Sequence, residues 1–153
     1  MNNLQGKIKT ETLLAVVLVA AVSCSRSPSG PDDVPGSVAS LIETLRQQGA
    51  SVAPMEQMSR DLHCLSVGPW RLEVNAENVY AFEYESAERA SRDAAGISPD
   101  GSTITADGRA CAISWTGPPR FYRQDRLIVL YAGTNQDVIR ILDGILGSPF
   151  AHR

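Results

Sequence analysis

The chain has 153 residues, of which 43% are hydrophobic and 20% are charged, and its formal net charge at pH 7 is -3. Both lysines lie near the N-terminus, and from Cys24 onward 12 arginines are outnumbered by 16 acidic residues. A mildly acidic chain without a basic stripe is unsuited to general nucleic-acid binding. The lack of lysine after Cys24 also excludes Schiff-base chemistry, a phosphate-binding P-loop and a Ser-Lys catalytic pair there.

The first two dozen residues have the pattern of an export signal. Two lysines precede an apolar run over residues 13–22, and small residues follow directly before Cys24. The run is about half the ~20 residues that a membrane-spanning helix needs, and its basic start and small-residue end are typical of a signal peptide. It resembles the signal of bacterial lipoproteins, in which an invariant cysteine receives diacylglycerol and becomes the new N-terminus. Cys24 is the matching position, although Ala21 stands where that family prefers leucine.

This resemblance implies that residues 1–23 are removed and that the bilayer is a partner through acylated Cys24. The protein would then lie on the outer face of the cytoplasmic membrane or on the outer membrane. A plain secretory signal and an uncleaved anchor are the alternatives. Residues 24–37 are polar and rich in Pro, Gly and Ser, which predicts a flexible tether after the lipidated cysteine. Residues 38–150 have the size of one domain, and residues 151–153 are expected to be a tail.

Two cysteines remain for the domain once Cys24 is lipidated. An exported protein meets an oxidising compartment, so we expect Cys64 and Cys111 to form a disulfide. The alternative is a pair of buried thiols that pack as small hydrophobic residues. His63 adjoins Cys64, but adjacent ligands rarely point at one ion, and no C-x-x-C motif completes a tetrahedral set. The sequence therefore predicts neither a metal nor a cofactor.

Apolar periodicity and capping residues predict three helices. They are expected between Ser37 and Gly49, between Ser86 and Gly96, and from Thr134 or Asn135 to Gly147. Apolar alternation predicts strands over 70–74, 79–84, 102–106 and 109–115, and a continuous apolar run predicts another over 127–131.

Turn residues join these strands into hairpins. The turn at Asp107-Gly108 would place Ile104 opposite Cys111. Hairpins in place of long crossovers favour an antiparallel sheet. The fold class expected is α+β, with two layers in which helices pack on the sheet.

Several segments of the second half of the chain are similar to small, uncharacterised bacterial lipoproteins. The matching residues are Ser98–Gly101, Trp115, Pro118–Arg123, Arg126–Tyr131 and Leu146–Phe150. They combine turn and core residues over roughly a third of the chain, and the resemblance implies no known activity.

No catalytic residue is assigned from the sequence. The chain lacks the G-x-S-x-G, H-E-x-x-H and P-loop motifs. His63 is the only histidine inside the expected domain, and a lone histidine beside a structural cysteine is expected to be a surface or hydrogen-bonded residue.

The candidate binding segment consists of residues 120–123 together with Arg126, and it follows a stiff Pro-Pro turn. Its rings offer stacking faces, and its arginines can grip a carboxylate or phosphate bidentately. In the alternative, both rings lie in the core and the arginines pair with nearby acids. The residues concerned are Arg120, Phe121, Tyr122, Arg123 and Arg126.

These observations favour a non-enzymatic, membrane-anchored binding or accessory module of the cell envelope. Its ligand or protein partner in the envelope is not identified by the sequence. The alternative is a periplasmic hydrolase acting on cell-wall or ester substrates, which needs a concave site with converging titratable groups.

Overall fold

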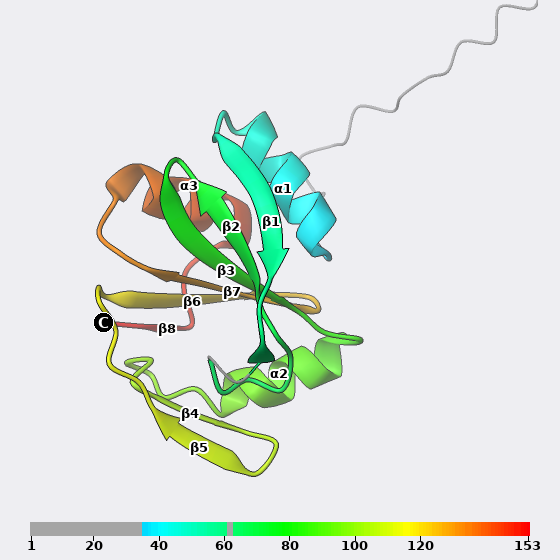
Figure 1. Ribbon diagram of the computed structural model, residues 1–153, viewed down its shortest axis with the longest axis vertical. Helices are drawn as coiled ribbons and strands as arrows, with labels where there is room; N and C mark the ends of the chain where they lie inside the picture. The colour runs from blue at the N-terminus through cyan, green and yellow to red at the C-terminus, as the bar shows by residue number, and fades with distance from the viewer. Residues whose placement is uncertain (1–34, 61–62) are drawn as a thin grey trace, which may run out of the picture. The chain divides into compact units, whose positions relative to one another are not determined.

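A computed structural model describes residues 35–60 and 63–153, so the predicted signal peptide, Cys24 and most of the tether lie outside the described residues. The described residues form three helices and eight strands (Figure 1). In chain order these are α1 (Val38–Gln47), β1 (Val52–Gln57), β2 (Trp70–Val74), β3 (Glu77–Glu83), α2 (Ala87–Ala95), β4 (Thr103–Ala106), β5 (Arg109–Ala112), β6 (Pro119–Gln124), β7 (Leu127–Ala132), α3 (Gln136–Leu146) and β8 (Ala151–His152).

Six strands form one antiparallel sheet in the order β1-β2-β3-β7-β6-β8, and β4 and β5 form a separate hairpin. The hairpin of β2 and β3 is confirmed, and positive φ angles at Asn75 and Ala76 make its two-residue turn. The turn at Asp107-Gly108 is likewise confirmed, with Ile104 opposite Cys111 as expected. Positive φ at both central residues gives a tight turn the twist that suits a hairpin.

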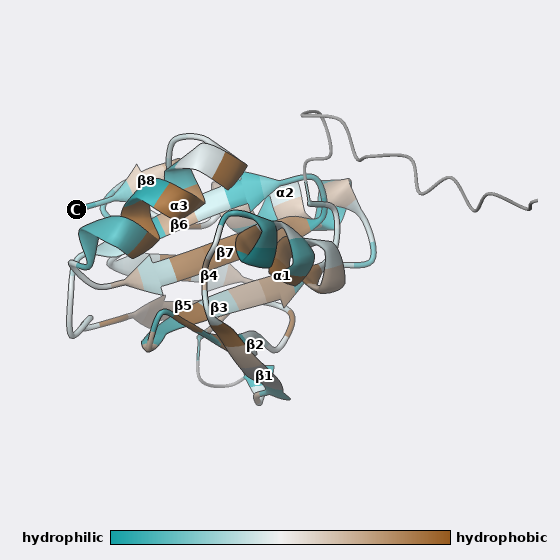
Figure 2. Ribbon diagram, turned by 90° about the horizontal axis from the view of Figure 1, so that it is seen from above, coloured by the Kyte–Doolittle hydropathy of each residue, from teal (hydrophilic) through white to brown (hydrophobic). Residues whose placement is uncertain are grey.

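The α+β class, with helices packed against an antiparallel sheet, is confirmed. The sheet is covered on both faces, so the structure has a further layer beyond the two expected. Hydrophobic residues of α1 and α3 pack on one face, and α2 and Ile104 of β4 pack on the other. This is why β7 is buried at every position from Leu127 to Tyr131, as is usual for a strand covered on both sides. Figure 2 shows hydrophobic residues along β3 and β7 and polar residues on the exposed sides of the helices.

The helices begin and end where their caps predict. Ser37 and Ser40 form a capping box at the start of α1, Ser86 accepts from Arg89 N at the start of α2, and Asn135 caps α3. A Cβ at Gly96 would clash with the carbonyl oxygen of Thr105. The end of α2 therefore lies directly against β4.

Strand β8 shows that the expected tail at residues 151–153 is wrong. Ala151 pairs with Phe121 of β6 and is only 1% exposed. The amide of Phe150 also donates to the carbonyl of Phe121 at 2.8 Å. Two residues are too few to produce a periodic signal in the sequence, but they complete the edge of the sheet and bury apolar surface against it.

The packed part of the chain begins before residue 38. Pro35 is buried, and the carbonyl of Gly36 accepts a hydrogen bond from Arg126 Nε at 2.9 Å. Arg126 also forms an ion pair of 2.7 Å with Glu83, whose second oxygen accepts from the amide of Val38 at 3.0 Å. The end of the expected tether is thus fixed to the sheet where the chain enters the domain.

Replacing Arg126 with alanine is expected to lower the free energy of unfolding by about 1 kcal/mol. The effect is moderate because the side chain is 39% exposed and solvent screens its charge. Hydrogen exchange of the Val38 amide should also accelerate, because Glu83 loses the cation that positions it.

The matched control is Arg140→Ala, which removes an ion pair with Asp137 whose side chains are 74% and 70% exposed. We expect this change to cost less than about 0.5 kcal/mol. Equal losses for the two variants in urea unfolding would contradict the structural role of Arg126.

Candidate functional site

The structure separates the residues of the candidate binding segment. They belong to strand β6 and to the turn after it, not to a loop. Phe121 and Tyr122 are fully buried, on opposite faces of the sheet. Arg123 is exposed, and Arg126 is engaged with Gly36 and Glu83. The rings therefore lie in the core, as in the alternative interpretation, and offer no exposed stacking surface.

Two members of this segment contribute to the face under α3. The Tyr122 hydroxyl donates to Asp143 at 2.9 Å, and burial, followed by this contact, raises the pKa of Tyr122 above its usual value. Arg120 is half-buried, and its Nε has no hydrogen-bond partner among the described residues. The hydrogen bond from Tyr122 thus connects β6 to α3, which gives this tyrosine a structural role.

The segments that resemble small lipoproteins meet in space. The indole Nε1 of Trp115 donates to the carbonyl of Gly101 at 2.8 Å, and its ring lies 5.8 Å from that of Phe121. The Phe121 ring in turn lies 6.2 Å from that of Phe150. In the turn before Gly101, hydrogen bonds from neighbouring serines lower the pKa of Asp100 to about 2. Trp115, Phe121 and Phe150 thus pack together and stabilise one end of the domain.

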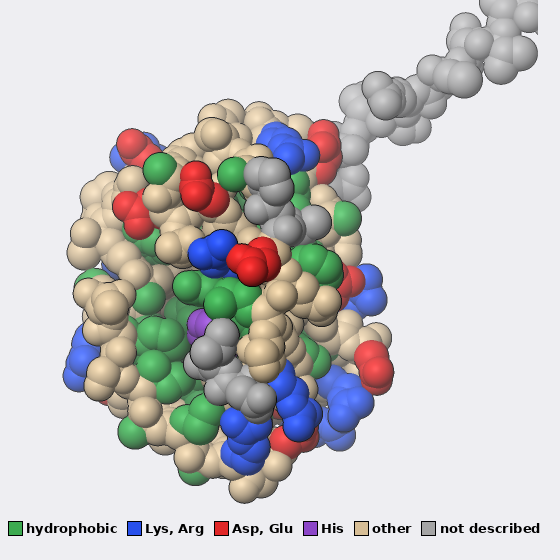
Figure 3. Space-filling model, in the orientation of Figure 1, with side chains coloured by type: hydrophobic (Ala, Val, Ile, Leu, Met, Phe, Trp, Pro, Cys, Tyr) green, Lys and Arg blue, Asp and Glu red, His purple; other side chains and the backbone are tan. Residues whose placement is uncertain are grey.

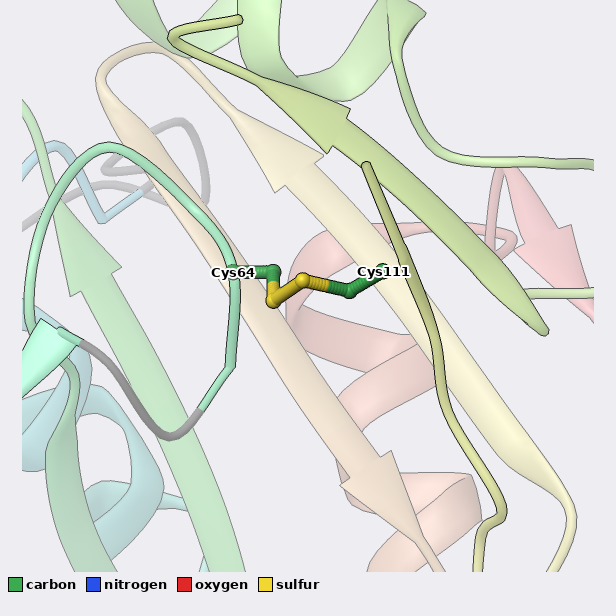
Figure 4. Close-up of a disulfide and its surroundings, with 2 residues drawn as sticks. All are labelled: Cys64 and Cys111. Carbon is green, nitrogen blue, oxygen red and sulfur yellow. A yellow bond between two sulfur atoms is a disulfide. The ribbon is translucent and has the colours of Figure 1, made fainter. Parts of the chain in front are cut away.

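The disulfide between Cys64 and Cys111 is present, as expected. It joins the loop before β2 to strand β5 (Figure 4). Cys64 has a φ of 58°, in the left-handed region that is uncommon for residues other than glycine. Because His63 directly precedes Cys64, the disulfide holds His63 close to the segment that follows β5.

A pocket of about 340 Å³ lies where these two segments meet the outer face of the sheet. Residues 113–116 of the linker from β5 to β6 line it beside the first residues of β3, and the disulfide-bonded loop contributes His63. Figure 3 shows hydrophobic side chains and a histidine gathered on this face. Its lining residues include His63, Asn78, Tyr80, Ser114 and Trp115.

His63 is only 9% exposed, and its position differs from the surface or hydrogen-bonded one expected. Its ring centroid lies 4.6 Å from that of Tyr80 and 5.6 Å from that of Phe82. Nδ1 is buried without a hydrogen-bond partner among the described residues. Loss of solvation lowers the pKa of His63 below 6.5, because a low-dielectric environment disfavours the charged form. The imidazole is therefore neutral at pH 7.

A second hollow, of about 400 Å³, lies between α2 and β4. Its lining mixes Arg89 and Arg92 with Asp93 and Asp107, so neither sign of charge dominates. Asp93 is committed to the fold, since it accepts from the Tyr84 hydroxyl and from the amide of Ser66, each at 2.8 Å. The pocket beside His63 resembles a ligand site more closely than this hollow does. Ligand sites are lined mainly by hydrophobic and aromatic residues, with a small number of polar groups.

Sequence reasoning missed this pocket. Tyr80 is recognisable as a member of an alternating strand, and Trp115 as an apolar residue beyond β5. No short-range pattern indicates that the segment after β5 lies beside the first residues of β3. The pairing of Cys64 with Cys111 is the one sequence feature that brings the two regions together.

Stability is expected to fall on acidification because of His63. Folding lowers its pKa, so the unfolded chain binds a proton more readily below pH 6.5. The loss begins as the pH drops through that value, continues to the lower folded-state pKa, and is at most about 1.4 kcal/mol per pH unit.

The variant His63→Phe keeps a ring beside Tyr80 and should remove this part of the pH dependence. Urea unfolding midpoints measured at pH 7 and about pH 5 test this expectation. The control is His152→Gln, which alters an exposed histidine. The same drop in His63→Phe as in the unmodified protein would show that another group is responsible.

Comparison with protein-family models, with curated proteins and with solved structures finds no match. The resemblance to bacterial lipoproteins stays a prediction from the sequence. Within residues 35–60 and 63–153, no helix combines the length and hydrophobicity needed to cross a membrane. In that same part of the chain, no cluster of three or more His, Cys, Asp or Glu side chains could hold a metal ion.

Proposed function

We propose that the protein is a lipoprotein of the cell envelope whose folded domain binds a small ligand in the pocket beside His63. The domain acts as a binding module, tethered to the bilayer through Cys24. The observation that carries the binding role is the pocket, which combines aromatic rings, a neutral imidazole and a few polar groups in one concave surface.

The lipid anchor is supported by the sequence before Cys24 and by the disulfide. Disulfides persist in oxidising compartments, which an exported protein reaches, and Cys64 and Cys111 form one here. Labelled palmitate should therefore enter the full-length protein in cells. The Cys24→Ala variant should lose the label, whereas Cys64→Ala, the matched control, should keep it. Labelling that survives the Cys24 substitution would contradict the anchor.

The geometry supports binding better than hydrolysis. A histidine that acts as a general base is held by an orienting hydrogen bond and contacts the group that it activates. His63 Nδ1 has no such partner in the described residues, and its ring packs on Tyr80 and Phe82 instead. A periplasmic hydrolase is therefore not proposed.

The binding role is tested by titrating the isotope-labelled protein with a set of small envelope compounds, including amines, amino sugars and short peptides. Amide shifts should cluster at Tyr80 and at residues 113–116. The control region is the shallow hollow at Arg140 and Gly144 on the other side of the sheet. Shifts confined to that region, or no shifts with any compound, would contradict the proposal.

A further inference from the structure

We propose that the pocket recognises an uncharged sugar ring, through stacking on its aromatic side chains and hydrogen bonds to its neutral polar groups. This inference rests on the proposed binding function and adds the chemical class of the ligand. It depends on three features of the pocket: the charge of the side chains that face it, its aromatic surface and its hydrogen-bonding groups.

Among the described residues that line the pocket, no ionised side chain faces it. Val79 packs under α1 and α3, on the opposite face of the sheet. Because side chains alternate along a strand, Glu77 points to that same face, where its carboxylate interacts with the Tyr131 hydroxyl. Asn78 points to the pocket instead, and burial keeps the imidazole of His63 neutral. A charged ligand would therefore give up solvation without gaining a partner for its charge, whereas an uncharged ligand would not.

The aromatic side chains suit a sugar ring. Tyr80 and Trp115 both line the pocket and are half-buried. The only polar atom of the indole is already used, since Nε1 donates to Gly101, so Trp115 offers ring surface alone. A sugar ring presents C–H groups that can pack against such a surface, which removes apolar area of both partners from water.

Neutral hydrogen-bonding groups accompany these rings. Asn78, Ser114 and Thr116 line the pocket and are exposed, and they supply an amide and two hydroxyls that both donate and accept. His63 adds an imidazole whose Nδ1 has no partner among the described residues. A ligand hydroxyl also donates and accepts, so it can pair with each of these groups and with either tautomer of the imidazole. An uncharged molecule that combines C–H surface with several hydroxyls is a sugar.

The test measures the fluorescence of Trp115 in the full-length protein, kept in a polyoxyethylene detergent that contains no sugar. The variant Trp70→Phe removes the other tryptophan, which packs on the opposite face of the sheet. The probes are glucose, galactose, mannose and N-acetylglucosamine, and we expect a saturable change with at least one of them. The matched controls are the amino sugar and the uronic acid of the same ring configuration, which carry opposite charges. Each should bind about fivefold or more weakly.

Two further ligands define what is recognised. Cyclohexanol has an apolar ring but a single hydroxyl, and it should bind about fivefold or more weakly than the best sugar. The methyl glycoside of that sugar distinguishes the two sources of such a ring. Retained binding indicates that a ring at the end of a glycan is accepted, and lost binding restricts the ligand to a free sugar.

Three variants locate the binding. Asn78→Ala should weaken the sugar about fivefold, while Gln47→Ala, which removes an exposed amide on α1, should leave its affinity unaltered. Tyr80→Leu removes a ring but keeps an apolar side chain, and it should also weaken the sugar. Asn78→Asp places a carboxylate on the pocket face, so the amino sugar should bind more tightly than it does without this substitution.

An amino sugar or uronic acid that binds as tightly as the uncharged sugar would overturn the assignment, and so would cyclohexanol of equal affinity. Equal effects of Asn78→Ala and Gln47→Ala would overturn the choice of this pocket. No response to any of the four sugars, with shifts caused by amines or peptides in the compound titration above, would overturn the sugar assignment and leave the binding function in place. No response in either experiment would overturn both.

Discussion

Replacing Phe121 with alanine is expected to lower the free energy of unfolding by about 3–5 kcal/mol. The ring is 0% exposed and packs between Trp115 and Phe150. The space around it is filled, because a Cβ at Gly101 would lie only 2.9 Å from this ring. The cavity left by the substitution cannot be closed by a small shift of the neighbours, so both the lost contacts and the cavity contribute. Urea unfolding followed by circular dichroism measures the loss.

The matched control is Arg123→Ala, which lies on the same strand and is exposed. Its cost is expected to be within about 0.5 kcal/mol. If the arginine variant were as destabilised as the phenylalanine variant, the assignment of β6 to the core would be wrong. A stable Phe121→Ala protein would contradict it in the same way.

Removal of the disulfide is expected to cost about 4 kcal/mol on the chain-entropy model. The bond joins residues separated by 47 positions, and cross-linking so long a loop reduces the conformational entropy of the unfolded chain. The double variant Cys64→Ser with Cys111→Ser should therefore melt well below the unmodified protein. Calorimetry with and without a thiol reductant measures this difference.

The double variant also controls for other effects of the reductant. Because it has no disulfide to reduce, the reductant should leave its melting temperature unchanged. The unmodified protein should lose stability with reductant and approach the double variant. Because the same bond holds the loop of His63 close to the segment after β5, the double variant is also expected to lose the amide shifts that a bound compound causes at Tyr80 and at residues 113–116. Unchanged stability on reduction would contradict the role given to the disulfide.

The helices and two of the hairpins could be predicted because their signals are local. Ser37, Ser86 and Asn135 satisfy the first amides of their helices, and each is followed by apolar residues at helical spacing. The Asp107-Gly108 turn likewise determines its own register. Such features depend on residues that are close in sequence, so they are readable without knowledge of the rest of the fold.

Strand β6 could not be predicted in this way. Pro119 begins it, at a position where the missing amide of proline is tolerated, but a Pro-Pro pair reads as a break. The adjacent burial of Phe121 and Tyr122 removes the alternation that identifies a strand. Both features arise because the sheet is covered on its two faces, which is a property of the assembled domain. The pocket beside His63 depends on tertiary structure in the same way, since its walls come from segments far apart in the chain.

The most direct test of the account is where a bound compound lies in the protein. Nuclear Overhauser contacts can be measured between the protons of a compound that binds in the titration described above and the side chains of the isotope-labelled full-length protein. The account predicts contacts to the ring protons of Tyr80 and Trp115. Contacts only to residues outside the pocket, such as exposed Phe150 or the side chain of Arg123, would contradict the claim that the pocket is the ligand site.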